Sequence, residues 1–167
     1  KMELIIQKAV ELGVYRIVPV ATRRAVVKLD KKKEEAKRKR WNAISESAAK
    51  QSKRLIIPEV TEVMNFSQAC ALASSFDRNF IPYELAQGME QTRQEFQKIS
   101  PGMEAGIFIG PEGGFDEEEI RTAVEAGIRP VTLGRRILRT ETAGLYVLSV
   151  LGFLLEDRED GAGDTAF

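Results

Sequence analysis

The stretch Leu133–Ala143, LGRRILRTETA, stands directly before the apolar run Gly144–Leu155. This run predicts a helix that is apolar nearly all round, and such a helix belongs inside a folded domain. The preceding residues Pro130–Leu133 predict a short buried strand, followed by a turn at Gly134. The sequence therefore predicts a charged, polar loop that is anchored to the domain core by a strand and a helix.

The start of the predicted helix carries both hydroxyl and charged side chains. Thr140 is a suitable N-cap, and Glu141 would lie in the first turn, where the helix dipole favours a carboxylate. A structural and a catalytic role for Glu141 are equally open at this point. Arg139 is harder to explain, because a cation beside a helix N-terminus is electrostatically misplaced unless an anion is bound there.

Composition excludes several classes of protein. The chain has 167 residues, 43% of them hydrophobic, which suits one globular domain with a substantial core. It has no histidine and a single cysteine, Cys70, so His/Cys zinc sites, histidine-based triads and disulfide frameworks are excluded. Cys70 is predicted to be a small core residue. No metal site is predicted.

Ala143–Leu155 is the longest apolar run, and it is too short to span a bilayer. The sequence shows no signal peptide, so a cytoplasmic location is expected. The first residue is Lys1 rather than a methionine. We therefore expect the chain to be part of a longer protein.

The net charge is zero, but the charges are unevenly distributed. From Arg23 to Arg54 there are thirteen Lys or Arg residues against four acidic ones, an excess of nine positive charges. This polarity is typical of a surface that binds a polyanion, although a solvated helix explains the cluster equally well. Trp41, Ile44, Ala48 and Leu55 continue at helical spacing and are expected to dock the second half of the basic helix.

The remaining elements are predicted from periodicity and breakers. Helices are predicted at Met2–Leu12 with Gly13 as its stop, near Ser67–Ala73, at Ala86–Lys98 (helix or loop) and at Asp116–Ala126. Strands or extended segments are predicted at Tyr15–Val20, Ile56–Val63, Arg78–Pro82 and Ala105–Ile109. Strands separated by helices indicate an α/β fold, with a parallel sheet covered by helices on both faces.

Three polar loops follow successive predicted strands: Pro82–Glu84, Gly110–Gly114 and Gly134–Glu141. In a parallel sheet such loops converge at the edge where ligands bind. The middle loop lacks the GK[ST] ending of a phosphate loop and contains Glu112. The following helix begins with four acids, among which Asp116 and Glu119 form a capping-box pattern. A neutral or cationic ligand suits this loop, and the structural alternative is a tight turn before a capped helix.

At this point the motifs resemble a known family. Lys1-Met2-Glu3 with QKAVELGV (Gln7–Val14), Gln51-Ser52-x-Arg54, IGPEGGF (Ile109–Phe115) and LGRRILRTETA are similar to the RsmE family. These are SPOUT-superfamily enzymes that methylate N3 of a uridine in small-subunit (16S) ribosomal RNA. The similarity runs from about residue 1 to residue 157. Lys50 and Lys53 depart from the family pattern, and both add positive charge.

The resemblance implies a SPOUT methyltransferase domain over residues 1–157 with a C-terminal trefoil knot. It also implies S-adenosyl-L-methionine as methyl donor and a homodimer with its active sites at the interface. Residues 158–167 are expected to form a disordered tail. We expect this chain to lack the N-terminal PUA-like RNA-binding domain of the family.

Transferred to this sequence, the resemblance makes the three loops the cofactor pocket. The expected cofactor-binding residues are Glu84, Gly110, Glu112, Gly113, Leu133, Gly134, Ile137 and Leu138. Leu133, Ile137 and Leu138 would contact the adenine, and the glycines would allow close approach of the backbone. Carboxylates would tolerate the sulfonium cation.

Methyl transfer requires alignment of nucleophile, methyl group and sulfur, and loss of the uracil N3 proton. That proton loss costs about 3 kcal/mol at neutral pH. The expected catalytic residues are Arg139 or Arg54 for stabilising the uracil anion and Glu141 as base or orienting group.

The expected RNA-binding residues hold the backbone of a substrate whose target base is splayed out of its stack. They are Arg23, Arg24, Lys28, Lys31, Lys32, Lys33, Lys37 and Arg38. Two alternatives stay open. The first is another SPOUT reaction on RNA, at a ribose 2′-oxygen or at guanine N1. The second is a non-catalytic RNA-binding module.

Overall fold

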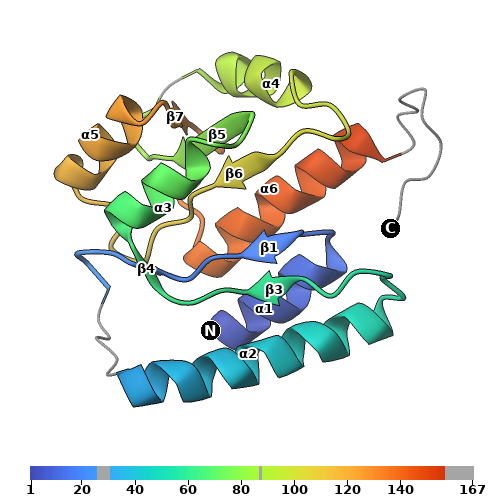
Figure 1. Ribbon diagram of the computed structural model, residues 1–167. Coiled ribbons are helices and arrows are strands. Elements are labelled where there is room, and N and C mark those ends of the chain that lie inside the picture. Colours follow the sequence, from blue (N-terminus) through green and yellow to red (C-terminus); the bar gives the residue numbers. More distant parts are fainter. Residues whose placement is uncertain (26–30, 87, 157–167) are drawn as a thin grey trace.

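The computed structural model describes residues 1–25, 31–86 and 88–156, and for Lys31 only the backbone (Figure 1). The helices are α1 (Met2–Glu11), α2 (Lys31–Gln51), α3 (Phe66–Ala73), α4 (Met89–Gln97), α5 (Glu117–Glu125) and α6 (Thr140–Leu155). The strands are β1 (Arg16–Ile17), β2 (Val20–Ala21), β3 (Glu59–Val60), β4 (Met64–Asn65), β5 (Arg78–Pro82), β6 (Ala105–Ile107) and β7 (Arg129–Val131). Among the described residues no helix is long and apolar enough to cross a membrane.

All strand pairs are parallel. β1 pairs with β3, β2 pairs with β4, and a central sheet has the order β6-β5-β7. In this sheet Phe80 of β5 lies opposite Ile107 of β6 and Arg129 of β7. The α/β class with parallel sheets and helices, predicted from the sequence, is confirmed.

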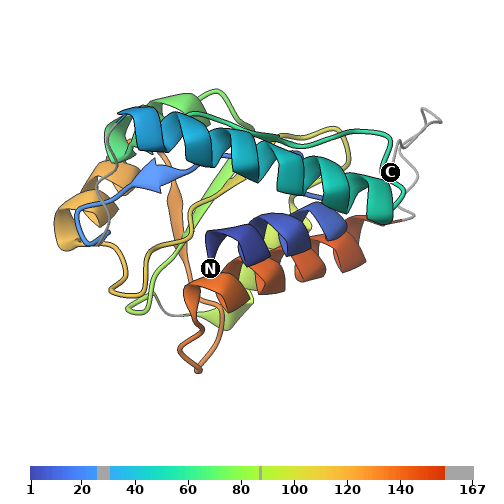
Figure 2. The same ribbon diagram turned by 90° about the horizontal axis from the view of Figure 1, so that it is seen from below.

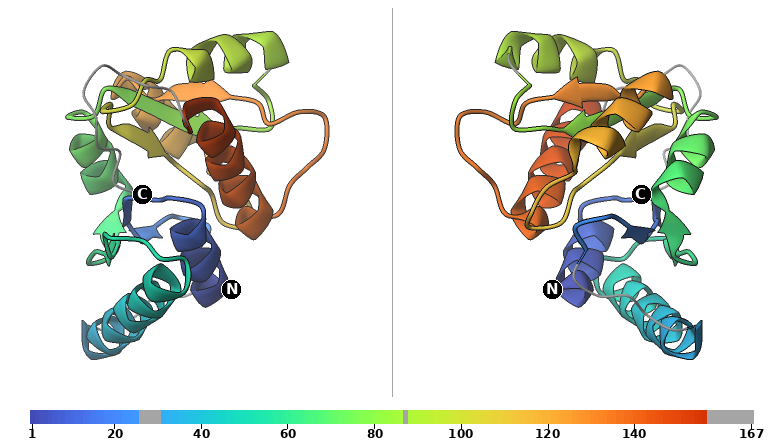
Figure 3. Two further views of the ribbon diagram at one scale, coloured as in Figure 1. Left: turned by 90° about the vertical axis from the view of Figure 1, so that its right-hand side faces the viewer. Right: turned by 90° about the vertical axis from the view of Figure 1, so that its left-hand side faces the viewer.

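Side chains alternate along β5, and this alternation places helices on both faces of the central sheet. Phe80 is fully buried with Phe96 of α4 and Val147 of α6. Its neighbour Ile81 is fully buried in a different cluster, with residues of α3 and α5. Figure 3 shows this sheet enclosed by helices.

A third cluster holds the N-terminal helices together. Ile6 and Val10 of α1 pack with Trp41 and Ala48 of α2 and with Val60 of β3. Figure 2 shows α1 lying between α2 and α6. The predicted docking of α2 through its second half is confirmed for Trp41, Ile44 and Ala48.

Several local predictions are also confirmed. Gly13 follows α1 with φ +90°, the left-handed conformation that suits a helix stop. Asp116 and Glu119 form the capping box of α5, with both reciprocal hydrogen bonds present. Cys70 is buried in the core, and burial raises the pKa of its thiol.

Three strand and docking predictions differ from the structure. The strand expected at Tyr15–Val20 is divided into β1 and β2, because Pro19 lies between them and has no amide hydrogen for a sheet. Leu55 lies beyond the end of α2 and is 81% exposed, so it does not dock that helix. Pro130 in β7 is exposed rather than buried, since β7 is an edge strand.

The C-terminal helix differs in two further respects. Its N-cap is Arg139, which makes no side-chain capping bond, and Thr140 is already helical. Within α6 only Val147 and Leu151 are buried, so the described part of the chain does not enclose the apolar helix. The expected tail at residues 158–167 lies outside the described residues.

Candidate functional site

Three loops leave the carboxyl ends of β5, β6 and β7 at one edge of the central sheet. The Tyr83 amide donates a hydrogen bond to the Val131 carbonyl at 3.0 Å, and the Phe108 amide donates to the Phe80 carbonyl at 2.9 Å. These bonds hold the starts of the three loops together. The residues predicted to bind the cofactor all belong to them: Glu84, Gly110, Glu112, Gly113, Leu133, Gly134, Ile137 and Leu138.

The middle loop is fastened to the first turn of α6. The Thr140 hydroxyl donates to the Gly110 carbonyl at 2.9 Å. Gly110 packs closely, because a Cβ there would lie 3.1 Å from the ring of the buried Phe115 and would require that ring to shift slightly. The hydrogen bond from Thr140 therefore joins the loop that follows β6 to the helix that follows β7.

The third loop is open and carries exposed apolar side chains. Gly134 has φ +107°, and an added Cβ would meet no atom within 4 Å. Ile137 is 90% exposed, and Leu85 in the first loop is 69% exposed. Leu133 and Leu138 are half-buried. A glycine with open space beside apolar side chains can accept a flat, partly apolar ligand against the backbone.

Four charged side chains meet beside this edge. The Lys1 ammonium makes an ion pair and a hydrogen bond with the Glu112 carboxylate, and lies 3.9 Å from Oε2 of Glu141. Arg139 acts electrostatically on both Lys1 and Glu112. Arg139, the cation at the N-terminus of α6, thus has the Glu112 carboxylate as its neighbour.

The pKa values in this cluster follow the ion pair. The hydrogen bond to Glu112 raises the pKa of the Lys1 ammonium. The same bond, together with the charges of Lys1 and Arg139, lowers the pKa of Glu112. Lys1 was not among the predicted site residues, although it stands in the Lys1-Met2-Glu3 motif. Its partners are more than a hundred residues away in the sequence, so only the fold could reveal them.

Arg54 lies elsewhere in this chain. Its guanidinium donates to the carbonyl oxygens of Val14 at 2.6 Å and Val10 at 3.1 Å, at the C-terminal end of α1. Burial lowers its pKa. Lys1 stands at the other end of α1, roughly 15 Å away at 1.5 Å per helical residue. A single chain therefore does not bring Arg54 to Arg139 and Glu141.

The two arginines before the basic helix bind the middle loop and α5. The Arg24 guanidinium donates to the Gly113 carbonyl at 2.6 Å. The Arg23 guanidinium pairs with Asp116 at 3.3 Å, and its backbone amide donates to the buried Glu119 at 2.9 Å. Candidate RNA-binding and cofactor-binding segments are thus in direct contact.

The other predicted RNA-binding residues belong mainly to α2. Lys32, Lys33 and Lys37 are exposed on its first half, and Arg38 forms an ion pair with Glu62 at 3.8 Å. Lys28 lies outside the described residues, as does the side chain of Lys31. The second half of α2 is fixed by Asn42, whose side-chain amide bonds to both the amide and the carbonyl of Val60.

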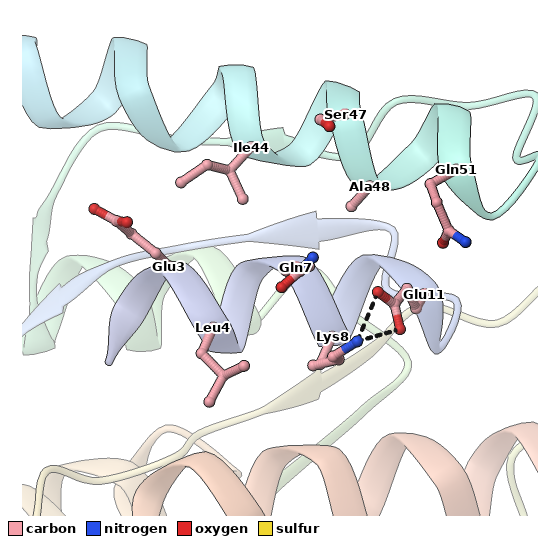
Figure 4. Close-up of a pocket in the computed structure, with 9 residues that line it drawn as sticks. All are labelled: Glu3, Leu4, Gln7, Lys8, Glu11, Ile44, Ser47, Ala48 and Gln51. Carbon is pink, nitrogen blue, oxygen red and sulfur yellow. Dashed lines mark hydrogen bonds and ion pairs between the residues drawn. The ribbon is translucent and has the colours of Figure 1, made fainter.

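Two cavities lie apart from the charged cluster. One of about 670 Å³ is a groove between α1 and α2 (Figure 4). It is lined by Glu3, Leu4, Gln7, Lys8, Glu11, Ile44, Ser47, Ala48 and Gln51. The other, of about 440 Å³, lies beside α4 and β7. The described residues contain no group of three or more His, Cys, Asp or Glu that could hold a metal ion.

The fold is one found in ribosomal RNA methyltransferases. The chain belongs to the RNA methyltransferase domain family, whose family model matches residues 1–152. A Bacillus subtilis relative named ribosomal RNA small subunit methyltransferase E is 40% identical over 93% of this chain and 62% of its own length. The protein of that name from Mesomycoplasma hyopneumoniae is 38% identical over 88% of this chain and 62% of its own. The chain thus spans less than two thirds of these relatives.

Solved structures agree with this assignment. A ribosomal RNA small subunit methyltransferase E from Neisseria gonorrhoeae, bound to S-adenosyl methionine, matches with a TM-score of 0.81. It is 34% identical, and the match covers 95% of this chain and 62% of that one. A Legionella pneumophila protein with the bound cofactor SAM matches with a TM-score of 0.83 at 37% identity, over 91% of this chain and 60% of that one.

Proposed function

We propose that this chain catalyses the S-adenosylmethionine-dependent methylation of uridine N3 in small-subunit (16S) ribosomal RNA. The observation that carries the proposal is the meeting of the three loops with the Lys1, Glu112, Arg139 and Glu141 cluster at one edge of the sheet. The relatives named above, and the cofactor in two of the solved structures, support it. A ribosomal RNA substrate implies that the protein acts in the cytoplasm.

The three loops at the carboxyl edge of the central sheet fit the proposed cofactor. The exposed Ile137 and the half-buried Leu133 and Leu138 offer apolar contact to an adenine ring. The open space at Gly134 allows a ligand to lie against the main chain. Glu112, whose pKa is lowered, stays ionised and tolerates a neighbouring sulfonium cation. When bound, the cofactor supplies an electrophilic methyl group.

The side chains of this chain then have to orient the uracil and remove its N3 proton. Glu141 is 20% exposed and stands in the first turn of α6, which Thr140 fixes to Gly110. We assign Glu141 the role of base or orienting group. We assign Arg139, which is exposed at the N-cap, to the methionine carboxylate or to the RNA.

We further infer a SPOUT-type fold in which residues 1–157 form the methyltransferase domain. The parallel sheet β6-β5-β7 and the bond from Thr140 to the loop after β6 are consistent with a C-terminal trefoil knot. The relatives extend well beyond the matched region, which leaves room for a further domain, such as a PUA-like one, in those proteins. The exposed lysines of α2 would hold the RNA backbone.

A homodimer is part of the proposal. Phe153 on α6 is 86% exposed and Leu4 on α1 is 48% exposed, and these two helices lie side by side. Exposed apolar side chains on two adjacent helices are expected to be covered by another protein surface. A second copy, seated with its own α1 and α6 on this surface, would form an isologous interface.

Titration calorimetry with S-adenosylmethionine tests the cofactor site. Gly134→Arg should abolish the binding, since a long side chain would fill the open space beside the backbone. Gly134→Ala is the control for strain, because any side chain is strained at φ +107°. We expect the alanine variant to bind more weakly than the unsubstituted chain and the arginine variant not at all. Equal binding by all three would place the cofactor elsewhere.

Product analysis of methylated 16S RNA then tests the reaction. Methyl transfer to uridine N3 supports the proposal, whereas a ribose 2′-O-methyl or N1-methylguanine product replaces it with another reaction. Near-normal turnover by both Arg139→Ala and Glu141→Ala would contradict their assigned roles. Cofactor binding without transfer to any RNA would favour a non-catalytic module.

A further inference from the structure

The Lys1 ammonium is shared between two carboxylates that differ in exposure. The Glu112 side chain is 70% exposed, whereas the Glu141 side chain is only 20% exposed. The 3.9 Å between Lys1 Nζ and Glu141 Oε2 is too long for a hydrogen bond. Glu141 Oε2 is buried, and the described residues provide it with no hydrogen-bond partner. The buried Glu141 oxygen thus lacks a hydrogen-bond partner among the described residues. It lies beside the Lys1 ammonium, whose closest contact is with Glu112.

A buried carboxylate oxygen without a hydrogen-bond partner costs free energy of folding. A ligand with an N–H group that binds beside Glu141 would supply the missing donor. Uracil offers such a group at N3, flanked by carbonyl oxygens on both sides. A lysine ammonium has three hydrogens to donate. Lys1 can therefore donate to a carbonyl oxygen of the same base whose N3–H faces Glu141.

We propose that Lys1 is a further catalytic residue, whose ammonium binds a carbonyl oxygen of the target uracil and stabilises the anion that forms at N3. This inference rests on the function proposed above. The N3–H proton passes to the Glu141 carboxylate, and the negative charge spreads over N3 and the two carbonyl oxygens. The N3 electron pair then forms a bond to the methyl carbon while the carbon–sulfur bond breaks, and its electron pair stays on sulfur. The proton on Glu141 returns to solvent.

The two arginines first expected to stabilise this anion are less well placed. Arg54 donates to backbone carbonyls at the far end of α1. Arg139 is exposed at the N-cap of α6 and makes no side-chain capping bond there. Among the described residues, Lys1 alone pairs with both Glu112 of the middle loop and Glu141.

The first test compares Lys1→Gln and Lys1→Arg in steady-state methyl transfer to 16S RNA. Loss of one donor to a developing anion is expected to lower kcat about 10²-fold. The KM for RNA and the affinity for S-adenosylmethionine should change little, and Lys1→Arg should retain most of the activity. Lys98→Gln is the matched control. The Lys98 side chain is 50% exposed, similar to the 45% of Lys1, and it is also paired with a carboxylate, that of Glu95 on α4. It should leave kcat unchanged.

The second test uses RNA with 5-fluorouridine at the target position. Fluorine makes the N3–H more acidic, so the anion needs less stabilisation and the loss caused by Lys1→Gln should shrink severalfold. A purely structural role for Lys1 would give the same loss on both RNAs and would overturn the inference. Unchanged kcat in Lys1→Gln would overturn it as well. Absence of methyl transfer by the unsubstituted protein would instead contradict the proposed function. Cofactor titration and a thermal melt of Lys1→Gln show whether the variant is folded.

Discussion

Glu119 shows how a single buried side chain connects distant parts of this chain. It is 4% exposed, and its two oxygens accept hydrogen bonds from the backbone amides of Asp116, at 3.0 Å, and Arg23, at 2.9 Å. The first bond closes the capping box of α5. The second fixes the segment that leads from β2 toward the basic helix. A carboxylate that receives two amide hydrogens is well satisfied inside a protein.

Replacing Glu119 should therefore destabilise the fold. Glu119→Ala leaves two amides without their acceptor, and we expect it to lower the free energy of unfolding by about 2 kcal/mol or more. Glu119→Gln keeps one acceptor oxygen and should cost about half as much. Urea denaturation of the three proteins measures the difference. A loss below about 0.5 kcal/mol for the alanine variant would mean that water replaces both bonds.

At the scale of elements, the N-terminus of α5 is stabilised by both a cap and a charge. The Asp116 side chain accepts a bond from the Glu119 amide and pairs with Arg23. The backbone hydrogen bond, followed by the charge of Arg23, lowers the pKa of Asp116 below its ordinary 3.8. A lowered carboxyl pKa means that this stabilisation is present above the unfolded pKa and is lost as the pH falls through the folded value.

Asp116→Asn and Asp116→Ala separate the cap from the charge. Asparagine is also a good N-cap, so the asparagine variant should be less stable than the unsubstituted chain at pH 7 but nearly equal to it at a pH below the folded pKa of Asp116. The alanine variant should be less stable at both values, because it lacks the cap. Urea midpoints at the two pH values measure this. If the difference in stability between the unsubstituted chain and Asp116→Asn did not depend on pH, the charge of Asp116 would not contribute to stability.

At the scale of the whole molecule, the incomplete burial of α6 leads us to expect a dimer. We expect the chain to sediment as a dimer at micromolar concentration, and Phe153→Asp to shift it to a monomer by placing a charge in the apolar surface. Val124→Asp is the control, since Val124 is an exposed apolar residue on α5, away from α1 and α6. Sedimentation velocity distinguishes the outcomes. A monomeric unsubstituted chain, or equal behaviour of both variants, would contradict the proposed interface.

The sequence by itself determined the local elements of this protein. The stop at Gly13, the capping box of Asp116 and Glu119, the strand Arg78–Pro82 and the three polar loops all depend on neighbours within a few residues. Their physics is short-range, so the periodicity and the side-chain types contain it. The parallel sheet followed from the alternation of strands and helices.

Only the tertiary structure decided which charges meet. Lys1 lies with Glu112 and Glu141, while Arg54 binds the end of α1, because α1 packs alongside α6 with their N-terminal ends together. It also decided that α6 is only partly enclosed, since burial depends on what the rest of the chain covers and not on the hydrophobicity of a segment. Contacts between residues a hundred positions apart are set by packing, and no local pattern encodes them.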